Sequence, residues 1–249
     1  FHQLINSVII LDEIQSYNNK LWGEISYFLK EFAYLMNTKI IIMSATLPDF
    51  DKLTDCIYPA VRLMVKREKY FQHPCFRNRV KISYELMDSG NIEEDLVKHI
   101  SRHAAKGKKI LVEFIKKSSA YKFFKRLLED ERILCDVEYM SGDDSIIERS
   151  RILGKIERAD KGIILVATQV IEAGVDIDMD IGYKNISKLD SEEQFMGRIN
   201  RSCKKAGRVY FFKLDDGRKI YRGDIRIDKD LTLENDKVKE LLINKDFDA

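Results

Sequence analysis

Residues 162–178 read Gly-Ile-Ile-Leu-Val-Ala-Thr-Gln-Val-Ile-Glu-Ala-Gly-Val-Asp-Ile-Asp. The opening six residues form a continuous apolar run that contains β-branched side chains, which predicts a strand buried on both faces. A polar segment containing Thr168, Gly174 and Asp176 follows directly. Strands of this kind are typical of parallel sheets covered by helices, and ligands bind where such strands end.

Short apolar runs of the same kind recur along the chain and alternate with helical patterns. They predict strands at residues 7–11, 39–43, 80–86, 109–114, 135–139, 162–167, 180–183 and 208–213. Amphipathic periodicity predicts helices at residues 19–36, 91–106, 118–131, 145–157, 192–200 and 231–244. Because strands and helices alternate, we predict the α/β fold class with parallel sheets.

Residues 48–79 interrupt this alternation with mixed charges and with all three prolines of the chain. We predict a first domain at residues 1–64, a linker at 65–79, a second domain at 80–214 and a tail at 215–249. The first domain holds only about two predicted strands, fewer than a typical sheet. The sequence also opens on Phe1 rather than Met. We therefore expect the chain to be a piece of a longer protein.

The composition indicates a folded chain without a large overall charge. Of 249 residues, 45% are hydrophobic and 34% are charged, and 43 Lys and Arg oppose 41 Asp and Glu for a net charge of +2. A wholly basic nucleic-acid-binding surface is therefore excluded. Residues 98–126, however, carry ten basic residues against one acid, Glu113. This stretch is either a phosphate-facing surface or a set of solvated helix faces, with equal weight for each.

Cysteine usage and the length of the apolar runs bear on the compartment. The four cysteines, Cys56, Cys75, Cys135 and Cys203, include no C-x-x-C pair, which indicates neither a zinc site nor a disulfide framework. No apolar run approaches the ~20 residues needed to cross a bilayer. We expect no membrane partner and a reducing, cytoplasmic location.

Two adjacent carboxylates, Asp12 and Glu13, follow the apolar run of residues 8–11. At the carboxyl end of a parallel strand an Asp can hold Mg²⁺, and a neighbouring Glu can deprotonate the water that attacks a γ-phosphate. Ser44 and Thr46 follow the next predicted strand, where hydroxyls can relay the occupancy of a nucleotide site. Each pair alone is more often a polar turn, and their combination favours a site.

The loop after residues 162–167 and the predicted helix that follows it add further candidates. Thr168 can bind a phosphate of a nucleic-acid strand, Gly174 permits close approach, and Asp176 can bond a ribose or an arginine. Arg198 and Arg201 lie three residues apart and can point together at one polyphosphate from a helix face. The plain alternatives are an acidic loop and a basic surface helix.

Four segments of the sequence resemble motifs II, III, V and VI of superfamily 2 helicases, in that order. They are Asp12-Glu13-Ile14-Gln15, Ser44-Ala45-Thr46, Ala167-Thr168-Gln169-Val170-Ile171-Glu172-Ala173-Gly174-Val175-Asp176 and Gln194-x-x-Gly197-Arg198-x-x-Arg201. Two of these segments have sequences that are typical of the CRISPR-associated helicase-nucleases of type I systems. They are Ser44-Ala45-Thr46-Leu47-Pro48 and Gly197-Arg198-Ile199-Asn200-Arg201. The resemblance spans residues 6–213, and the combination is specific although each motif alone is weak.

This resemblance implies a motor built from two RecA-like domains. The chain would hold the C-terminal part of the first domain and the whole of the second. Such a motor binds ATP and Mg²⁺ between its domains and moves 3′ to 5′ along single-stranded DNA during antiviral interference. The implied partners are single-stranded DNA, a CRISPR RNA-guided target-recognition complex, and a nuclease domain or subunit.

Residue by residue, the resemblance implies Asp12 as the Mg²⁺ ligand and Glu13 as the general base. The other implied roles are contact with the triphosphate for Gln194, Arg198 and Arg201, coupling of hydrolysis to movement for Ser44 and Thr46, and contact with the DNA backbone for Thr168 and Gln169. Gly174 and Asp176 complete the candidates for cofactor binding.

The sequence departs from the family pattern in two respects. Phe195 follows Gln194, where many helicases carry an arginine. The phosphate loop G-x-x-x-x-G-K-[ST] does not occur in these 249 residues, so we expect the chain alone not to hydrolyse ATP. The alternatives are another superfamily 2 helicase or translocase acting on RNA or DNA, and a non-catalytic fragment that binds nucleic acid or protein.

Overall fold

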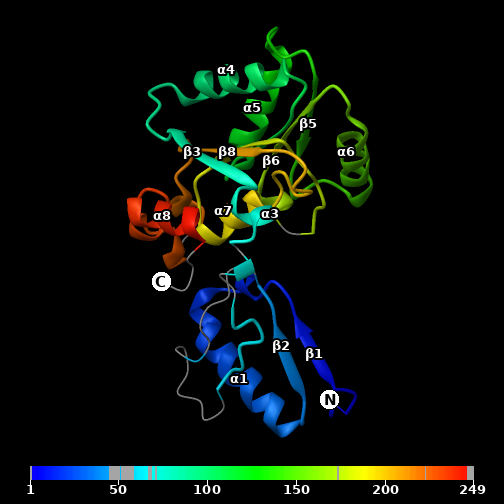
Figure 1. Cartoon of the computed structure of the whole chain (residues 1–249), viewed down its shortest axis with the longest axis vertical. Coiled ribbons are helices and arrows are strands. Elements are labelled where there is room, and N and C mark those ends of the chain that lie inside the picture. The colour runs from blue at the N-terminus through cyan, green and yellow to red at the C-terminus, as the bar shows by residue number, and fades with distance from the viewer. Residues whose placement is uncertain are drawn as a thin grey trace. The chain divides into compact units, whose positions relative to one another are not determined.

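The chain forms two compact units in the computed structural model (Figure 1). The structure describes residues 2–44, 51, 59–66, 69–70, 72–172, 174–221 and 223–245. The first unit comprises Phe1–Arg67 with Gly223–Ile225, and the second comprises Glu68–Arg222 with Arg226–Ala249. The main division thus falls inside residues 65–79, where the sequence predicts a linker.

The first unit is a single β-α-β arrangement. Strands β1 (Val8–Leu11) and β2 (Lys39–Ile42) pair in parallel, and two 3-10 turns (Ile14–Ser16, Asn19–Leu21) and helix α1 (Trp22–Leu35) connect them. Branched apolar residues favour extended strands, and a parallel pair needs a long crossover connection of this kind. In the register, Leu11 lies opposite Ile42, so both strands end at the same edge.

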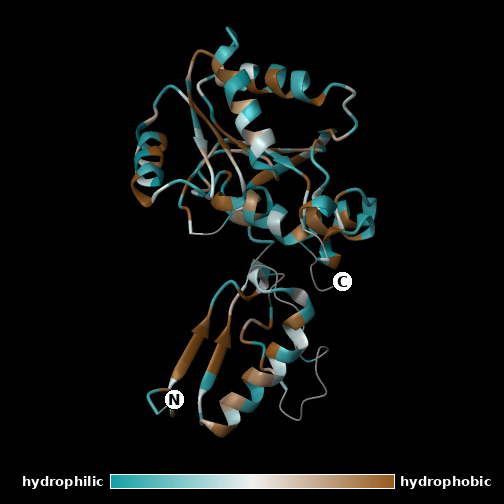
Figure 2. Cartoon of the chain, turned by 180° about the vertical axis from the view of Figure 1, so that it is seen from behind, coloured by the Kyte–Doolittle hydropathy of each residue, from teal (hydrophilic) through white to brown (hydrophobic). Residues whose placement is uncertain are grey.

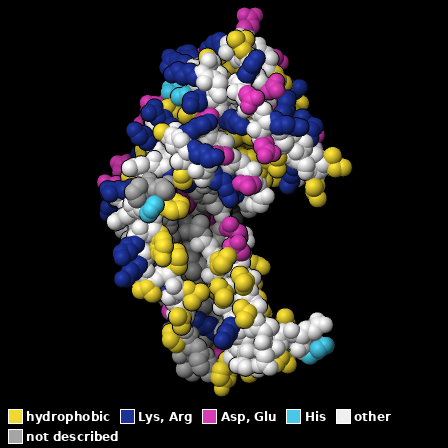
Figure 3. All heavy atoms as spheres, turned by 45° about the vertical axis from the view of Figure 1, so that its right-hand side comes forward, with side chains coloured by type: hydrophobic (Ala, Val, Ile, Leu, Met, Phe, Trp, Pro, Cys, Tyr) yellow, Lys and Arg dark blue, Asp and Glu magenta, His cyan; other side chains and the backbone are white. Residues whose placement is uncertain are grey.

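Apolar side chains of the first unit stay exposed among the described residues. Val8 and Ile10 of β1 are 59% and 60% exposed, and Phe28 and Leu35 of α1 are also exposed. Figure 2 shows the hydrophobic character of β1 and β2, and Figure 3 shows hydrophobic side chains on the surface of this unit. The two-stranded sheet therefore leaves part of its apolar surface unburied.

The second unit contains six parallel strands in the order β3-β8-β7-β4-β6-β5. Their bounds are β3 (Val80–Leu86), β4 (Lys109–Glu113), β5 (Asp136–Met140), β6 (Ile163–Ala167), β7 (Ile181–Asn185) and β8 (Gly207–Phe212). Because all the strands are parallel, their carboxyl ends meet at one edge of the sheet. The predicted α/β class with parallel sheets is confirmed.

Helices cover both faces of this sheet (Figure 1). The covering helices are α4 (Ile92–Ala104), α5 (Lys117–Glu129), α6 (Ile146–Arg158), α7 (Leu189–Met196) and α8 (Asp236–Asn244), and the short helix α3 (Pro74–Arg77) precedes β3. Side chains alternate between the two faces of a strand. Leu111 and Leu165 accordingly share one core with residues of α6, α7 and α8, whereas Val112 and Val166 share the other with α4 and α5. None of the helices in the described part of the chain is long and apolar enough to cross a membrane.

The C-terminal residues pack into the second unit. Leu233, Val238 and Leu242 are buried in the core that α6 and α7 cover. The helix predicted at residues 231–244 is present as α8, but it begins only at Asp236. The Asn235 side chain accepts a hydrogen bond from the Lys237 main-chain N–H at its start. This is the usual N-cap arrangement, which satisfies a donor that the helix leaves free.

The helix that carries Gln194 lies earlier than predicted. The sequence predicts residues 192–200, but α7 ends at Met196, and Asn200 adopts a left-handed φ of 48° that a right-handed helix does not allow. The Arg79 guanidinium donates to the carbonyls of Met196 and Ile199 at 3.2 and 3.1 Å, which satisfies acceptors freed at the helix end. The prediction that Arg198 and Arg201 share one helix face is therefore wrong.

Candidate functional site

The end of β1 presents the first candidate carboxylates. Asp12 is exposed, and its Oδ1 accepts a hydrogen bond from the Glu13 main-chain N–H at 2.9 Å. Glu13 has a left-handed φ of 56°, which is costly for a side chain larger than glycine and is common at functional sites. The next residue, Ile14, is buried. This turn leaves the Asp12 carboxylate accessible to solvent.

The end of β2 lies beside the end of β1. The Met43 main-chain N–H donates to the Leu11 carbonyl at 2.8 Å, which continues the pairing to the residue before Asp12. Ser44 follows directly and is half-buried. Ser44 and Asp12 thus leave adjacent strands at the same edge. Thr46 lies outside the described residues.

The loop after β6 holds the candidate DNA contacts. Thr168 is buried and precedes a 3-10 turn at Gln169–Ile171. The Gln169 Nε2 donates to the Ile115 carbonyl at 3.0 Å and to the Tyr221 hydroxyl at 2.7 Å. The predicted contact of the Gln169 side chain with DNA therefore requires this amide to exchange its partners.

Gly174 in the same loop has a φ of 69°, a left-handed conformation that favours glycine. A Cβ at this position would have no described atom within 4 Å. The left-handed backbone conformation therefore explains why this position is a glycine, whereas close contact with neighbouring described atoms does not.

Two arginines that follow α7 bind this loop. Arg198 is half-buried, and its guanidinium donates to the carbonyls of Ile171 and Glu172 at 3.0 and 2.5 Å. Arg201 is exposed, and its Nε lies 3.1 Å from Asp176 Oδ1. The arginine partner considered for Asp176 is thus present within the chain. The loop after β6 and the residues after α7 form one connected structure.

Gln194 lies on α7, four residues before Arg198, and is half-buried. One candidate triphosphate contact, Gln194, therefore lies in the last turn of α7, and another, Arg198, lies just after the helix ends. The turn after Met196 separates them, so their relative position depends on how that turn is held.

A buried charged group below this loop was missed by the sequence analysis. We call it the Lys184 cluster, and it comprises Lys184, Glu113, Glu172, Ser191 and Glu192. The Lys184 Nζ forms an ion pair with Glu113 and lies 3.1 Å from Glu172 Oε1, 3.1 Å from Ser191 Oγ and 3.7 Å from Glu192 Oε2. Lys184 and Glu192 are 0% exposed and Glu113 is 1% exposed. A lone lysine inside the apolar strand at residues 181–185 was the available signal.

The cluster contains three carboxyl groups and one ammonium, so the environment decides which groups are charged. Burial raises the pKa of Glu192 to about 8 and raises that of Glu113 well above its usual range, and Lys184 offsets this only in part. Burial is the largest influence on Glu172 and opposes its ionisation, but Lys184 and the side-chain hydrogen bonds with Glu113 and Ser191 together lower the pKa of Glu172. Burial also opposes the charge of Lys184, but the carboxylates raise its pKa.

Burial thus favours the protonated form of Glu113 and Glu192, whereas the surroundings of Glu172 favour its ionised form. Glu113 Oε2 and Glu192 Oε2 are buried without a hydrogen-bond partner among the described residues. A near-neutral cluster avoids the high cost of uncompensated buried charge.

We expect Glu192→Gln to flatten the pH dependence of stability. Glu192 keeps its proton up to about pH 8 in the folded chain and loses it near its usual value of 4.5 when unfolded. The contribution of Glu192 to the free energy of unfolding is therefore complete below pH 4.5 and is lost as the pH rises through 8. The free energy changes by at most about 1.4 kcal/mol per pH unit. Urea denaturation at pH 5, 6, 7 and 8 measures it. Glu240→Gln, an exposed position on α8, is the control, and equal slopes for all three proteins would contradict the expectation.

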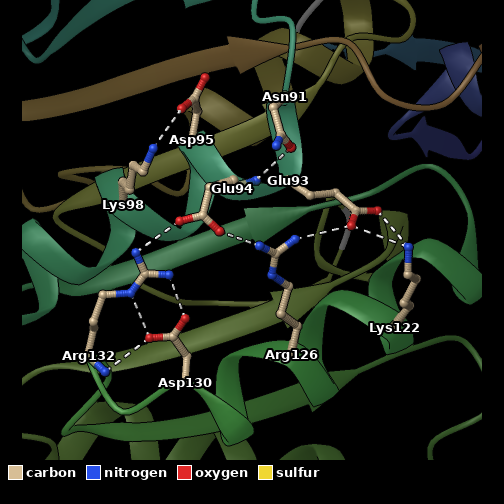
Figure 4. A network of polar contacts seen from close by, with 9 residues as sticks. All are labelled: Asn91, Glu93, Glu94, Asp95, Lys98, Lys122, Arg126, Asp130 and Arg132. Atoms are coloured by element: carbon tan, nitrogen blue, oxygen red, sulfur yellow. Dashed lines mark hydrogen bonds and ion pairs between the residues drawn. The ribbon is translucent and has the colours of Figure 1, made fainter.

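Part of the basic stretch at residues 98–126 is neutralised by neighbouring acids (Figure 4). Lys122 and Arg126 on α5 lie 2.9 and 3.3 Å from carboxylate oxygens of Glu93 on α4. Arg126 also pairs with Glu94. Glu93 and Glu94 precede the stretch in sequence, so the local charge count overlooked them. This part of the stretch is a salt-bridged helix contact rather than a phosphate-facing surface.

The six-stranded parallel sheet with helices on both faces resembles the RecA-like folds of solved helicases. The structure of T. fusca Cas3 is similar, with a TM-score of 0.65 and 14% identity, over 86% of this chain and 32% of that chain. The Mycobacterium smegmatis helicase Lhr bound to ssDNA and AMP-PNP is similar with a TM-score of 0.53 and 16% identity, over 84% of this chain and 29% of that chain. At these identities the likeness concerns the fold alone.

Residues 107–204 match the family model described as "CRISPR-associated nuclease/helicase Cas3, C-terminal". The CRISPR-associated nuclease/helicase Cas3 of Methanothermobacter thermautotrophicus is 27% identical over 216 residues, covering 78% of this chain and 24% of the relative. A putative Cas3 of Methanocaldococcus jannaschii is 26% identical over 219 residues, covering 84% and 29%. The chain thus spans about a quarter of the length of these relatives. The matches confirm the resemblance of this sequence to Cas3-type CRISPR helicases.

Proposed function

We propose that this chain is part of an ATP-dependent motor that moves along single-stranded DNA in CRISPR antiviral interference. The observation that carries the proposal is the bidentate contact of Arg198 with the carbonyls of Ile171 and Glu172. It fixes a cation against the loop that follows a central parallel strand. The carboxyl edge of such a sheet is where nucleotides and phosphates bind.

In this proposal residues 1–64 belong to the first motor domain and residues 80–214 to the second. Asp12 is the Mg²⁺ ligand, which its exposed carboxylate fits because Mg²⁺ binds proteins through one or two carboxylates together with water and phosphate oxygens. The bound ion would neutralise charge on the triphosphate. Glu13 orients the attacking water and takes its proton.

The remaining motif residues divide between nucleotide and DNA. Arg198 and Arg201 stabilise the charge that develops on the transferred phosphoryl group, and Gln194 contacts the triphosphate. Ser44 and Thr46 couple hydrolysis to movement. Thr168 and Gln169 contact the DNA backbone, and Gly174 and Asp176 shape the loop at the nucleotide.

The activity belongs to the full-length helicase rather than to this chain alone. The 249 residues contain no phosphate loop, so the chain by itself does not hydrolyse ATP on this proposal. A nuclease domain or subunit and an RNA-guided target-recognition complex are the proposed partners, in the cytoplasm. The names of the two curated relatives, which describe a CRISPR-associated nuclease/helicase, support the proposal of a nuclease partner.

We expect Arg198→Ala in the full-length helicase to lower the kcat of DNA-stimulated ATP hydrolysis by about 10- to 100-fold. This is less than the full effect of an arginine finger, because Arg201 still supplies charge. Phosphate release with saturating single-stranded DNA measures the rate. Arg218→Ala, at an exposed arginine of the second unit, is the matched control.

An unchanged kcat in a folded Arg198→Ala protein would contradict the role of Arg198. Stimulation by RNA and not by single-stranded DNA would instead favour another superfamily 2 translocase. The absence of ATP hydrolysis in the full-length protein would favour a non-catalytic binding function.

A further inference from the structure

The Lys184 cluster connects three elements of the second unit: the loop after β6, strand β7 and helix α7. Lys184 belongs to β7, Glu172 to the loop after β6, and Ser191 to α7. The Lys184 ammonium donates to both Glu172 Oε1 and Ser191 Oγ at 3.1 Å. The Ser191 hydroxyl also donates to Glu172 Oε1. One buried cation therefore holds the loop and the helix against the sheet.

Glu172 is held at both its side chain and its main chain. Its carboxylate binds Lys184 and Ser191, and its main-chain carbonyl accepts a hydrogen bond from Arg198 Nη2 at 2.5 Å. The side chain of Glu172 is only 14% exposed. The carbonyl that receives Arg198 thus lies in a residue whose carboxylate depends on Lys184.

Within the cluster, the carboxylate of Glu172 has the ammonium of Lys184 as its cationic partner. Without that ammonium, the carboxyl group of Glu172 stays buried either as an unpaired charge or in its protonated form. Both states cost free energy unless the Glu172 side chain turns toward water. Such a turn would displace the Glu172 carbonyl as well. The position of the Arg198 guanidinium would change with it.

We propose that Lys184 is a positioning residue of the motor, which acts through Glu172 to set the place of the Arg198 guanidinium at the triphosphate. This inference rests on the role of Arg198 in the proposed function. Lys184 itself touches neither the nucleotide nor the DNA. A misplacement of about 1 Å in a catalytic group can cost about 100-fold in rate. A buried residue that only sets the position of the Arg198 guanidinium can therefore control the rate of hydrolysis.

The test uses a charge-balanced pair, Lys184→Met with Glu172→Gln, in the full-length helicase. Removal of both charges avoids the uncompensated carboxylate of Glu172 that Lys184→Met alone would leave in the cluster. Lys213→Met with Glu234→Gln is the matched control, because it makes the same two changes at another ion pair of the second unit, with a 2.6 Å separation. Hydrogen exchange of residues 168–176 and steady-state ATP hydrolysis are both measured.

We expect the pair at the cluster to speed hydrogen exchange of residues 168–176 about tenfold. We expect kcat to fall about 10- to 100-fold with a much smaller change in KM, because the lost contact acts in the transition state. Addition of Arg198→Ala should lower kcat no further than Arg198→Ala does alone, since both changes remove one interaction. The control pair should leave exchange and kcat unchanged.

Three results would overturn the proposal. They are unchanged exchange of residues 168–176, an unchanged kcat in the charge-balanced pair, and losses that multiply when Arg198→Ala is added. The exchange measurement needs no ATP, so it tests Lys184 even if the proposed function fails. Failure of the proposed function is recognised separately, by an unchanged kcat in Arg198→Ala.

Discussion

Glu13→Gln in the full-length helicase is expected to lower DNA-stimulated ATP hydrolysis by about 10²- to 10⁴-fold while ATP binding stays unchanged. An amide of the same size can still hold a water molecule but cannot take its proton. Phosphate release measures hydrolysis, and titration with a fluorescent ATP analogue measures binding. Glu24→Gln, at an exposed glutamate of α1, is the matched control.

The geometry around Glu13 makes this substitution informative. Glu13 lies in a left-handed conformation between the end of β1 and the buried Ile14. Glutamine has the same backbone requirements as glutamate, so the strain of the turn does not change. A hydrolysis rate equal to that of the parent would remove Glu13 from the role of general base and leave the turn with a structural role only.

Lys184→Met is expected to lower the free energy of unfolding of the second unit by about 3–5 kcal/mol, the range for breaking a buried ion pair on one side. Methionine has a similar length but leaves the Glu172 carboxylate without its cation. Urea denaturation of the 249-residue chain at pH 7 measures the change. Lys237→Met, at an exposed position of α8, is expected to change stability by less than about 0.5 kcal/mol.

The charge-balanced pair Lys184→Met with Glu172→Gln is expected to recover most of this loss. The penalty comes mainly from the uncompensated carboxylate, and the second substitution removes it. A change of less than about 0.5 kcal/mol in Lys184→Met itself would show that the carboxylate had reached water or another partner. If the double variant is as unstable as Lys184→Met alone, the lost free energy of unfolding comes from altered packing rather than from the unpaired carboxylate.

The strands and the loops after them could be predicted because their signals are local. Each apolar run is continuous in sequence, and the candidate residues Asp12 and Thr168 follow such runs directly. The end of α7 could not be placed in this way. It depends on Arg79, which precedes β3 and reaches the helix end from more than a hundred residues away in sequence. Asn200 was the one local sign of a left-handed residue.

The basic stretch shows the same limit for charge. A window over residues 98–126 counts Arg126 as free positive charge, but its partners Glu93 and Glu94 lie on the preceding part of α4. Ion pairs form between surfaces that the fold brings together. A count along the chain therefore overestimates the exposed positive charge of this region.

The sequence by itself determined the α/β class, the order of the motifs and the loops that carry them, because strand patterns and turn residues act over a few neighbouring positions. Only the tertiary structure decided that Lys184, Glu113, Glu172 and Glu192 share one buried cluster below the loop that binds Arg198. These residues come from separate elements, and the strand order that joins them is not written in any local pattern. Their charges are likewise set by burial, which only the packed fold creates.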